Sequence, residues 1–214
     1  MAKVVLIIGE SGSGKTTSMR NLPPETTAFI DCDGKGLSWK GWKKQYNAER
    51  GNYMRTADAL MVQAALNKIS SGNKFKYVVV DTLNGIMVTD EMRRMSEKGY
   101  DKWVDLASSV WDLINDAQYL RDDLTVFFVG HSETVRDDSG YVFTRMKTSG
   151  KALSKIVLES KFQVVLLSRI VDGKHVFEVH AHDSTAKTPY GAYDESTMTV
   201  DNDIVEVMKV LEDF

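Results

Sequence analysis

The sequence predicts an α/β protein whose mostly parallel sheet is covered by helices on both faces. Short apolar runs that are typical of strands buried on both faces alternate with segments of helical periodicity. Strands that alternate with helices are joined by right-handed crossovers, which align the strands in parallel. The apolar runs that predict strands lie at residues 4–8, 28–30, 77–80, 126–129 and 164–167.

Three helices and one hairpin follow from periodicity and from capping residues. Residues 101–121 carry apolar side chains at three- and four-residue steps, which is the pattern of a helix that packs on a sheet. A second helix is expected over residues 58–70, with Asp58 as its N-cap and Gly72 after its end, and a last one near Asp203. Residues 163–180 depart from the parallel order, because strand-like segments flank the turn pair Asp172-Gly173 and predict a late antiparallel hairpin.

Length and composition are those of an ordinary globular protein. The chain has 214 residues, of which 43% are hydrophobic and 27% charged, and we expect a single domain over residues 1–214. No apolar run has the length of a signal peptide or a membrane span, and the single cysteine, Cys32, forms no intrachain disulfide. These features predict a protein of a reducing cytoplasm without a membrane partner. The net charge of −3 argues against a surface that binds nucleic acid throughout, but it allows a local basic patch.

The most specific motif follows the first predicted strand directly. Residues 9–16 read GESGSGKT and match G-x-x-x-x-G-K-[ST] at every position, with a helical stretch expected at 17–21. Glycines let backbone N–H groups turn toward a β-phosphate, while Lys15 is expected to reach the β- and γ-phosphates and Thr16 to offer its hydroxyl to Mg²⁺. The motif predicts a P-loop nucleoside triphosphatase that binds ATP and Mg²⁺. The predicted nucleotide-binding residues are Gly9, Glu10, Ser11, Gly12, Ser13, Gly14, Lys15, Thr16 and Thr17.

Acidic residues at the ends of two other predicted strands complete this site. Asp81 ends the third apolar run and is expected to anchor Mg²⁺ together with Thr16. Asp31 and Asp33 follow the second run, and hydrolysis needs a group that orients the attacking water. We favour Asp33, because it lies farther beyond the carboxyl end of its strand and therefore nearer the phosphates. Asp31 in that role, and a turn role for Asp33, stay open as alternatives.

Five segments along the chain carry a family resemblance. They are GESGSGKT at 9–16, FIDCD at 29–33, VVVDT at 78–82, FFVGH at 127–131 and AKTP at 186–189. In this order they resemble the RecA-like ATPase core, in particular the short phage-encoded RecA-core ATPases associated with single-strand DNA annealing and recombination. The resemblance covers nearly the whole chain. It implies an ATPase with a catalytic acid at Asp33 and a γ-phosphate-sensing residue at His131. It also implies that Lys187 reaches the ATP of a neighbouring subunit, and therefore that the protein self-associates.

Basic residues gather after His131. Residues 132–150 predict a small hairpin with its turn at 137–140, and no acidic residue lies between Gly140 and Lys155. We expect this segment to bind single-stranded DNA, with Tyr141 or Phe143 stacking on bases. A merely solvated face is the alternative. The residues predicted to contact DNA phosphates are Arg145, Lys147 and Lys151.

Another basic and aromatic segment lies earlier in the chain. It begins at Lys35 and contains Trp39 and Trp42, three residues apart. Tryptophans at this spacing are more typical of helix packing than of base stacking, so we interpret them as packing residues.

The function that these observations favour is an ATPase whose nucleotide state controls single-stranded DNA binding in phage-type recombination or annealing. Such a protein would act in the cytoplasm of a bacterial host. A nucleotide-dependent protein-interaction module remains an alternative. A P-loop small-molecule kinase is a further one, although the sequence shows no arginine-rich lid.

Overall fold

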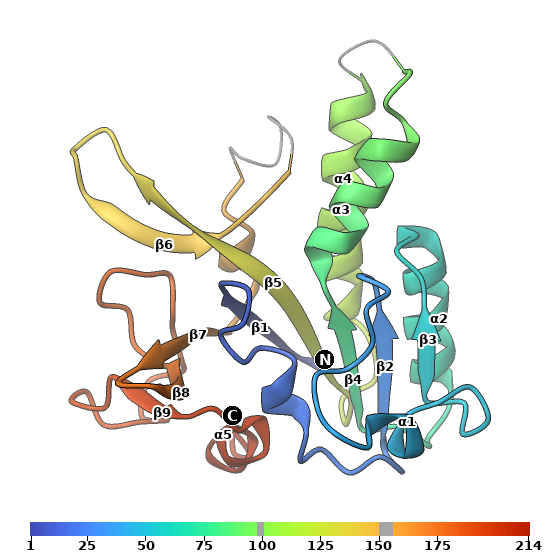
Figure 1. The fold of residues 1–214 in the computed structure, drawn as a ribbon, viewed down its shortest axis with the longest axis horizontal. Helices are drawn as coiled ribbons and strands as arrows, with labels where there is room; N and C mark the ends of the chain where they lie inside the picture. Colours follow the sequence, from blue (N-terminus) through green and yellow to red (C-terminus); the bar gives the residue numbers. More distant parts are fainter. Residues whose placement is uncertain (98–100, 150–155) are drawn as a thin grey trace.

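One mixed sheet forms the centre of the molecule in the computed structural model, which describes residues 1–97, 101–149 and 156–214. The nine-stranded sheet has the order β3-β2-β4-β5-β1-β7-β8-β9, and β6 pairs with β5 outside this path (Figure 1). The strands are β1 (Lys3–Gly9), β2 (Thr27–Asp31), β3 (Tyr53–Arg55), β4 (Tyr77–Asp81), β5 (Thr125–Arg136), β6 (Val142–Met146), β7 (Val164–Val171), β8 (Lys174–Glu178) and β9 (Thr199–Asp201). The predicted α/β class with a mostly parallel sheet and a late antiparallel hairpin is confirmed.

The order of the parallel strands brings the polar strand ends together. β5 lies between β1 and β4, and all three run parallel, as does β2 on the far side of β4. In this register Gly9 is opposite His131, and Asp31 is opposite Asp81. Because parallel strands end at the same edge, four separate segments place their chemistry-bearing residues at one edge of the sheet.

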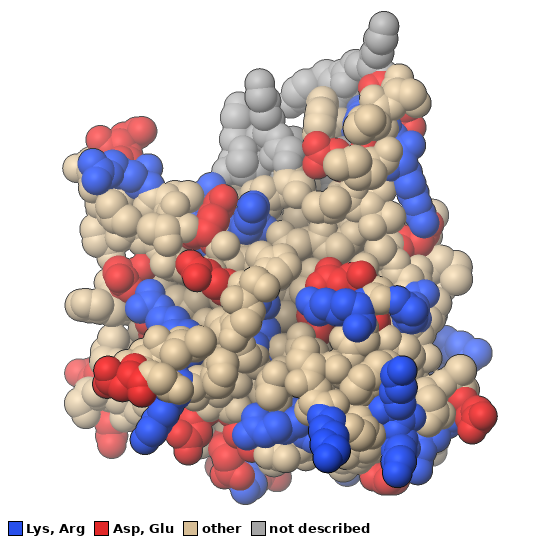
Figure 2. Space-filling view, in the orientation of Figure 1, with Lys and Arg blue, Asp and Glu red and all other residues tan. Residues whose placement is uncertain are grey.

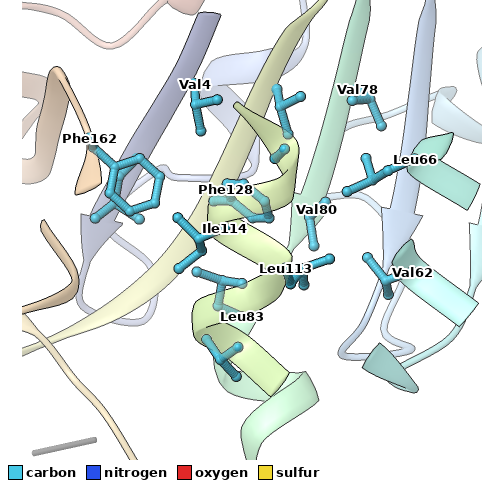
Figure 3. Close-up of a cluster of buried hydrophobic side chains, with 14 of the residues drawn as sticks. Val4, Val62, Leu66, Val78, Val80, Leu83, Leu113, Ile114, Phe128 and Phe162 are labelled. Carbon is cyan, nitrogen blue, oxygen red and sulfur yellow. The ribbon is translucent and has the colours of Figure 1, made fainter. Parts of the chain in front are cut away.

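Helices cover both faces of the sheet. On one face α2, α3 and α4 pack on Val4, Leu6 and Ile8, and on the other η1, α1 and α5 pack on Val5 and Ile7. This alternation is expected of a strand buried on both faces. Figure 3 shows Ile114 of α4 beside Phe128 of β5 in the first of these cores. The helices are α1 (Trp42–Gln45), α2 (Ala59–Ser71), α3 (Leu83–Arg93), α4 (Asp101–Ala117) and α5 (Ile204–Val210), with 3₁₀ turns η1 (Thr17–Met19) and η3 (Leu158–Lys161).

The helices predicted over residues 58–70, over residues 101–121 and near Asp203 are present, with small changes of boundary. Asp58 caps α2 by accepting hydrogen bonds from the backbone N–H groups of Leu60 and Met61, and Gly72 ends the helix as expected. Asp203 caps α5 in the same way. The long amphipathic helix α4 ends at Ala117, before the predicted end at residue 121. Among the described residues, no helix combines the length and the apolar character that crossing a membrane requires.

Both predicted hairpins are present. At the β7–β8 turn Asp172 has φ 50° and Gly173 has φ 76°, as a two-residue type I′ connection requires. The β5–β6 hairpin turns at residues 137–140, where the Asp137 carboxylate accepts hydrogen bonds from the backbone N–H groups of Ser139 and Tyr141. Figure 1 shows this ribbon leaving the sheet on the side away from α2.

The helix expected after the phosphate-binding loop is reduced to a short turn. Residues 17–21 were predicted to be helical, but only the 3₁₀ turn η1 (Thr17–Met19) forms. Pro23 and Pro24 follow closely, and a proline disfavours helical backbone at the residue before it. The loop therefore relies on its own backbone and side chains rather than on a long helix to meet an anion.

Candidate nucleotide-binding site

The GESGSGKT segment leaves the end of β1 and curls over the edge of the sheet. Gly12 has φ 81° and Gly14 has φ 106°, conformations that side-chain-bearing residues rarely adopt. The loop borders a cavity of about 330 Å³ that is rich in basic and hydroxyl side chains. The lining residues are Ser11, Gly12, Gly14, Lys15, Thr16, Thr17, Lys35, Ser38, His131 and His175. Thus six of the nine predicted nucleotide-binding residues line one cavity, together with His131.

Lys15 is a buried cation at this cavity. Its Nζ donates hydrogen bonds to the carbonyl oxygens of Gly9 at 2.9 Å and Glu10 at 2.7 Å. Burial lowers the pKa of Lys15 to about 8, and the nearby Asp81 partly opposes this shift. The ammonium is therefore mostly charged at pH 7 and only thinly solvated, so a polyphosphate in the cavity would gain a strong electrostatic partner.

Thr16 and Asp81 form the part of the site that fits Mg²⁺. The Thr16 hydroxyl donates to Asp81 Oδ2 at 2.6 Å, while Asp81 Oδ1 is buried and has no hydrogen-bond partner among the described residues. Burial raises the pKa of Asp81, and the hydrogen bond from Thr16 opposes that rise. A buried carboxylate oxygen without a partner beside a hydroxyl is a donor set that suits a hard cation. The described residues contain no larger cluster of His, Cys, Asp and Glu, so further ligands would come from phosphate and water.

The two candidate acids after β2 have different surroundings. Asp31 is buried and accepts hydrogen bonds from the Gly34 and Gly36 backbone N–H groups and from the Tyr53 hydroxyl at 2.6 Å, so it holds its loop together. Asp33 instead accepts from the Thr82 hydroxyl at 2.8 Å and from Lys35 Nζ at 2.6 Å.

Three features of Asp33 bear on its predicted role. Burial alone would raise the pKa of Asp33, but the hydrogen bonds from Lys35 and Thr82 outweigh it and hold the pKa below its ordinary value. Gly85 lets the first turn of α3 approach, since a Cβ there would lie 2.7 Å from Asp33 Oδ1. Asp33 itself is not among the cavity-lining residues, whereas its partner Lys35 is. The geometry favours Asp33 over Asp31, and its role in orienting water stays a prediction.

His131 lies where β5 passes the phosphate-binding loop. Its side chain lines the cavity, and its backbone N–H donates to Asn84 Oδ1 at 2.7 Å. Burial, and then the positive charge of Lys15, lower the pKa of His131, which favours the neutral imidazole at pH 7. A neutral imidazole can both donate and accept a hydrogen bond, so it can respond to a phosphate nearby.

A family model described as AAA domain matches residues 1–190, which include the phosphate-binding loop, Asp81 and His131. The chain belongs to the AAA domain family. A search of curated proteins finds no match. The P-loop NTPase core that the motif predicted is thereby supported, and nucleotide binding and hydrolysis are the activities that an AAA domain suggests.

This AAA domain also uses residues at its nucleotide cavity that the sequence did not reveal. The Ser13 carbonyl is 2.8 Å from both the Ser168 hydroxyl and His175 Nδ1, and a carbonyl only accepts, so Nδ1 carries a proton. His175 follows the β7–β8 turn, where nothing in the local sequence marks it. The sequence marks Lys35 only as part of the basic and aromatic segment. In that segment Trp39 packs on Phe29, which agrees with the interpretation of its tryptophans as packing residues.

The remaining predicted residues of the AAA domain lie apart from the cavity. Arg145 pairs with Glu133 at 3.0 Å, whereas the Lys147 side chain is exposed. Lys187 exchanges backbone hydrogen bonds with Val165 and does not line the cavity. Lys151 lies outside the described residues. Figure 2 shows both acidic and basic side chains over the β5–β6 hairpin, so its charge is less one-sided than the sequence run after Gly140 indicated.

Proposed function

We propose that this AAA domain is a Mg²⁺-dependent ATPase whose nucleotide state controls binding of single-stranded DNA, in phage-type recombination or annealing within a bacterial host. The observation that carries the proposal is the course of one strand. β5 passes the cavity at His131 and then continues, without a break, into the β5–β6 hairpin. A change at the γ-phosphate and a change at the hairpin are therefore linked through a few residues of one strand.

The hydrolysis step assigns one task to each residue of the site. Lys15 places its charge where negative charge develops on the γ-phosphate, and Thr16 and Asp81 would hold the Mg²⁺ that neutralises the phosphates. Asp33 orients the attacking water and accepts its proton. The water oxygen bonds to the γ-phosphorus, the bond to the β–γ bridging oxygen breaks, and ADP leaves with that electron pair.

The hairpin supplies the proposed DNA contacts. Lys147 and Arg145 would meet phosphates, as would Lys151 outside the described residues. Tyr141 and Phe143 stack on one another, with ring centroids 5.9 Å apart and planes 14° from parallel, and Tyr141 is half exposed. Stacked aromatic rings, here with the Tyr141 ring exposed, beside basic side chains are a common platform for bases of a single strand. Because the whole protein is acidic, several subunits along one strand would be needed for tight binding.

Binding of a single-stranded oligonucleotide tests this function, measured with ATP and with ADP over a salt series. We expect the ATP form to bind more tightly, with a log–log salt slope of about −0.7 for each phosphate contacted. The Arg145→Glu/Lys147→Glu pair should weaken binding, while Lys40→Glu/Lys44→Glu, an equal charge change on exposed lysines outside the hairpin, should have a smaller effect. If wild type and the Arg145→Glu/Lys147→Glu variant bind the oligonucleotide with the same affinity, with ATP and with ADP, DNA is removed from the proposal. That result would favour a protein-interaction module.

We also propose that one domain spans residues 1–214 and that neighbouring subunits complete each ATP site through Lys187. The single domain is supported by one sheet that contains both β1 and β9. A lysine that acts across an interface predicts complementation. Lys187→Ala and Lys15→Ala proteins, each inactive alone, should recover activity when they form mixed oligomers. Mixed oligomers that stay inactive would contradict this role of Lys187.

A further inference from the structure

The buried side-chain amide of Asn84 bonds to both sides of the base of the β5–β6 hairpin. Asn84 Oδ1 accepts from the His131 N–H at 2.7 Å, and Asn84 Nδ2 donates to the Lys147 carbonyl oxygen at 2.9 Å. His131 and Lys147 are themselves paired, since the Lys147 N–H donates to the His131 carbonyl at 2.8 Å. Asn84 is 7% exposed. Its Oδ1 and its Nδ2 are thus both used, one toward His131 of β5 and the other toward Lys147, the residue that follows β6.

The segment that carries Asn84 begins at the nucleotide site. Asn84 stands in the first turn of α3, three residues after Asp81. The intervening Thr82 caps that turn and donates its hydroxyl to Asp33 Oδ1 at 2.8 Å. The segment that bears the proposed Mg²⁺ ligand and contacts the proposed water-orienting acid therefore also carries Asn84.

A second buried group fixes the far strand of the hairpin to a different part of the chain. Glu159 is 5% exposed, and its Oε1 accepts from the Met146 N–H at 2.7 Å and from the Thr185 hydroxyl at 3.1 Å. The backbone of Thr144 also pairs with residues 183 and 185. The hairpin is thus held on its outer side by Glu159 and on its nucleotide side by Asn84. Of these two buried side chains, Asn84 is the one that bonds to a residue of the nucleotide cavity, His131.

We propose that Asn84 is a positioning residue that transmits the state of the nucleotide site to the β5–β6 hairpin. A shift of the Asp81–Thr82 segment when the γ-phosphate is lost would displace both partners of the amide together, because leaving a buried N–H or carbonyl unpaired is unfavourable. This inference rests on the proposed nucleotide control of the hairpin but not on DNA as its ligand.

Hydrogen–deuterium exchange of residues 132–146 tests it, with Mg²⁺ and either ADP or a non-hydrolysable ATP analogue. In wild type we expect exchange in the hairpin to differ between the two nucleotides by about fivefold or more, the usual lower range of coupling between sites. In Asn84→Ala that difference should fall to within about twofold, while protection of residues 9–17 by nucleotide persists. Asn67→Ala, at an exposed asparagine of α2, is the matched control and should behave as wild type.

Steady-state kinetics separate positioning from simple loss of structure. Asn84→Ala should lower kcat about 10-fold to 100-fold with KM changed much less, as expected when an orienting contact is lost. Asn84→Asp keeps the shape and the acceptor for His131 but loses the donor to Lys147, so it should also lose the exchange difference. It serves as the readout if Asn84→Ala fails to fold.

The outcomes distinguish this inference from the proposed function. A nucleotide-dependent difference in wild type that survives in both Asn84 variants would overturn the role of Asn84 and leave the proposed function standing. No difference in wild type would contradict nucleotide control of the hairpin itself, and the inference with it. Loss of the difference in the Asn84 variants, with the Asn67 control unchanged, would support the inference.

Discussion

The nucleotide cavity and the β5–β6 hairpin are both polar regions, but they hold their charges differently. Lys15 at the cavity and Asp81 beside Thr16 are buried, and one carboxylate oxygen of Asp81 has no partner within the described part of the chain. On the hairpin, Arg145 is partly exposed and already paired with Glu133. Burying an unpaired charge is costly, whereas exposed ion pairs contribute little. The buried charges at the cavity therefore favour a bound ligand more strongly than the paired charge of the hairpin does.

The largest expected effect tests the cavity directly. Lys15→Ala removes the buried ammonium and should reduce ATP hydrolysis by about 10²-fold to 10³-fold, the range for loss of one preorganised electrostatic group. Lys44→Ala, at an exposed lysine of α1, is the control and should leave hydrolysis unchanged. Phosphate release assays compare the two variants. Near wild-type turnover by Lys15→Ala would contradict the role of Lys15 in hydrolysis.

Asp81→Asn should separate the effect of Asp81 on hydrolysis from its effect on the stability of the fold. Hydrolysis should fall about 10²-fold and lose its Mg²⁺ dependence, because the amide has no charge for the cation. Since burial raises the pKa of Asp81, the neutral amide should leave the thermal midpoint of the nucleotide-free protein equal or higher. A Mg²⁺ titration and a melting curve measure the two effects. Unchanged Mg²⁺ dependence would reject Asp81 as a ligand.

The pair Asp33 and Asp31 gives a comparison within one loop. Asp33→Asn should bind ATP normally but hydrolyse it about 10²-fold more slowly. Asp31→Asn should instead lower the free energy of unfolding by about 1–3 kcal/mol, because its buried carboxylate accepts from two backbone N–H groups. Nucleotide binding, turnover and urea denaturation of both variants are the measurements. If Asp33→Asn loses ATP binding, Asp33 has a structural role instead.

The lowered pKa of Lys15 predicts how ATP affinity depends on pH. Without nucleotide this pKa is about 8, and a bound triphosphate raises it, so binding takes up a proton above pH 8. Affinity should therefore fall as pH rises above 8, by at most about tenfold per pH unit. Because the unfolded lysine keeps its ordinary pKa of 10.5, the nucleotide-free protein should also gain stability over the same range. Calorimetry from pH 7 to 9.5 checks the first effect, and a flat profile would contradict it.

The smallest expected effect lies on the hairpin. Lys147→Ala should weaken DNA binding several-fold and reduce the salt slope by about 0.7. Arg145→Ala should do less, because Glu133 already neutralises its charge. Filter binding at several salt concentrations compares the two variants. A larger effect of Arg145→Ala would mean that its ion pair opens on binding.

Much of the fold was predictable because its signals are local. Strands buried on both faces leave continuous apolar runs, and Asp58 and Asp203 mark helix starts by capping. Helix α3 was not predicted, because its buried residues cluster near its start and the rest of it is polar. The edge strand β3 is three residues long and only partly buried, too short for a periodicity to show.

The residues of the candidate site also differ in whether their signals are local in sequence. The phosphate-binding loop is contiguous in sequence, so its residue types and spacing predicted it. His175 contacts Ser13 and Asn84 contacts His131, and the members of each pair are distant in sequence and meet only in the folded protein. No local pattern could identify them.

The sharpest test of coupling between the nucleotide site and the hairpin of this AAA domain is phosphate release with and without single-stranded DNA at low salt. DNA should accelerate release by the wild-type protein. No acceleration is expected for Lys15→Ala, and a reduced one for the Arg145→Glu/Lys147→Glu pair. An ATPase rate that is the same with and without saturating DNA would contradict the coupling and leave a nucleotide site whose partner is something else.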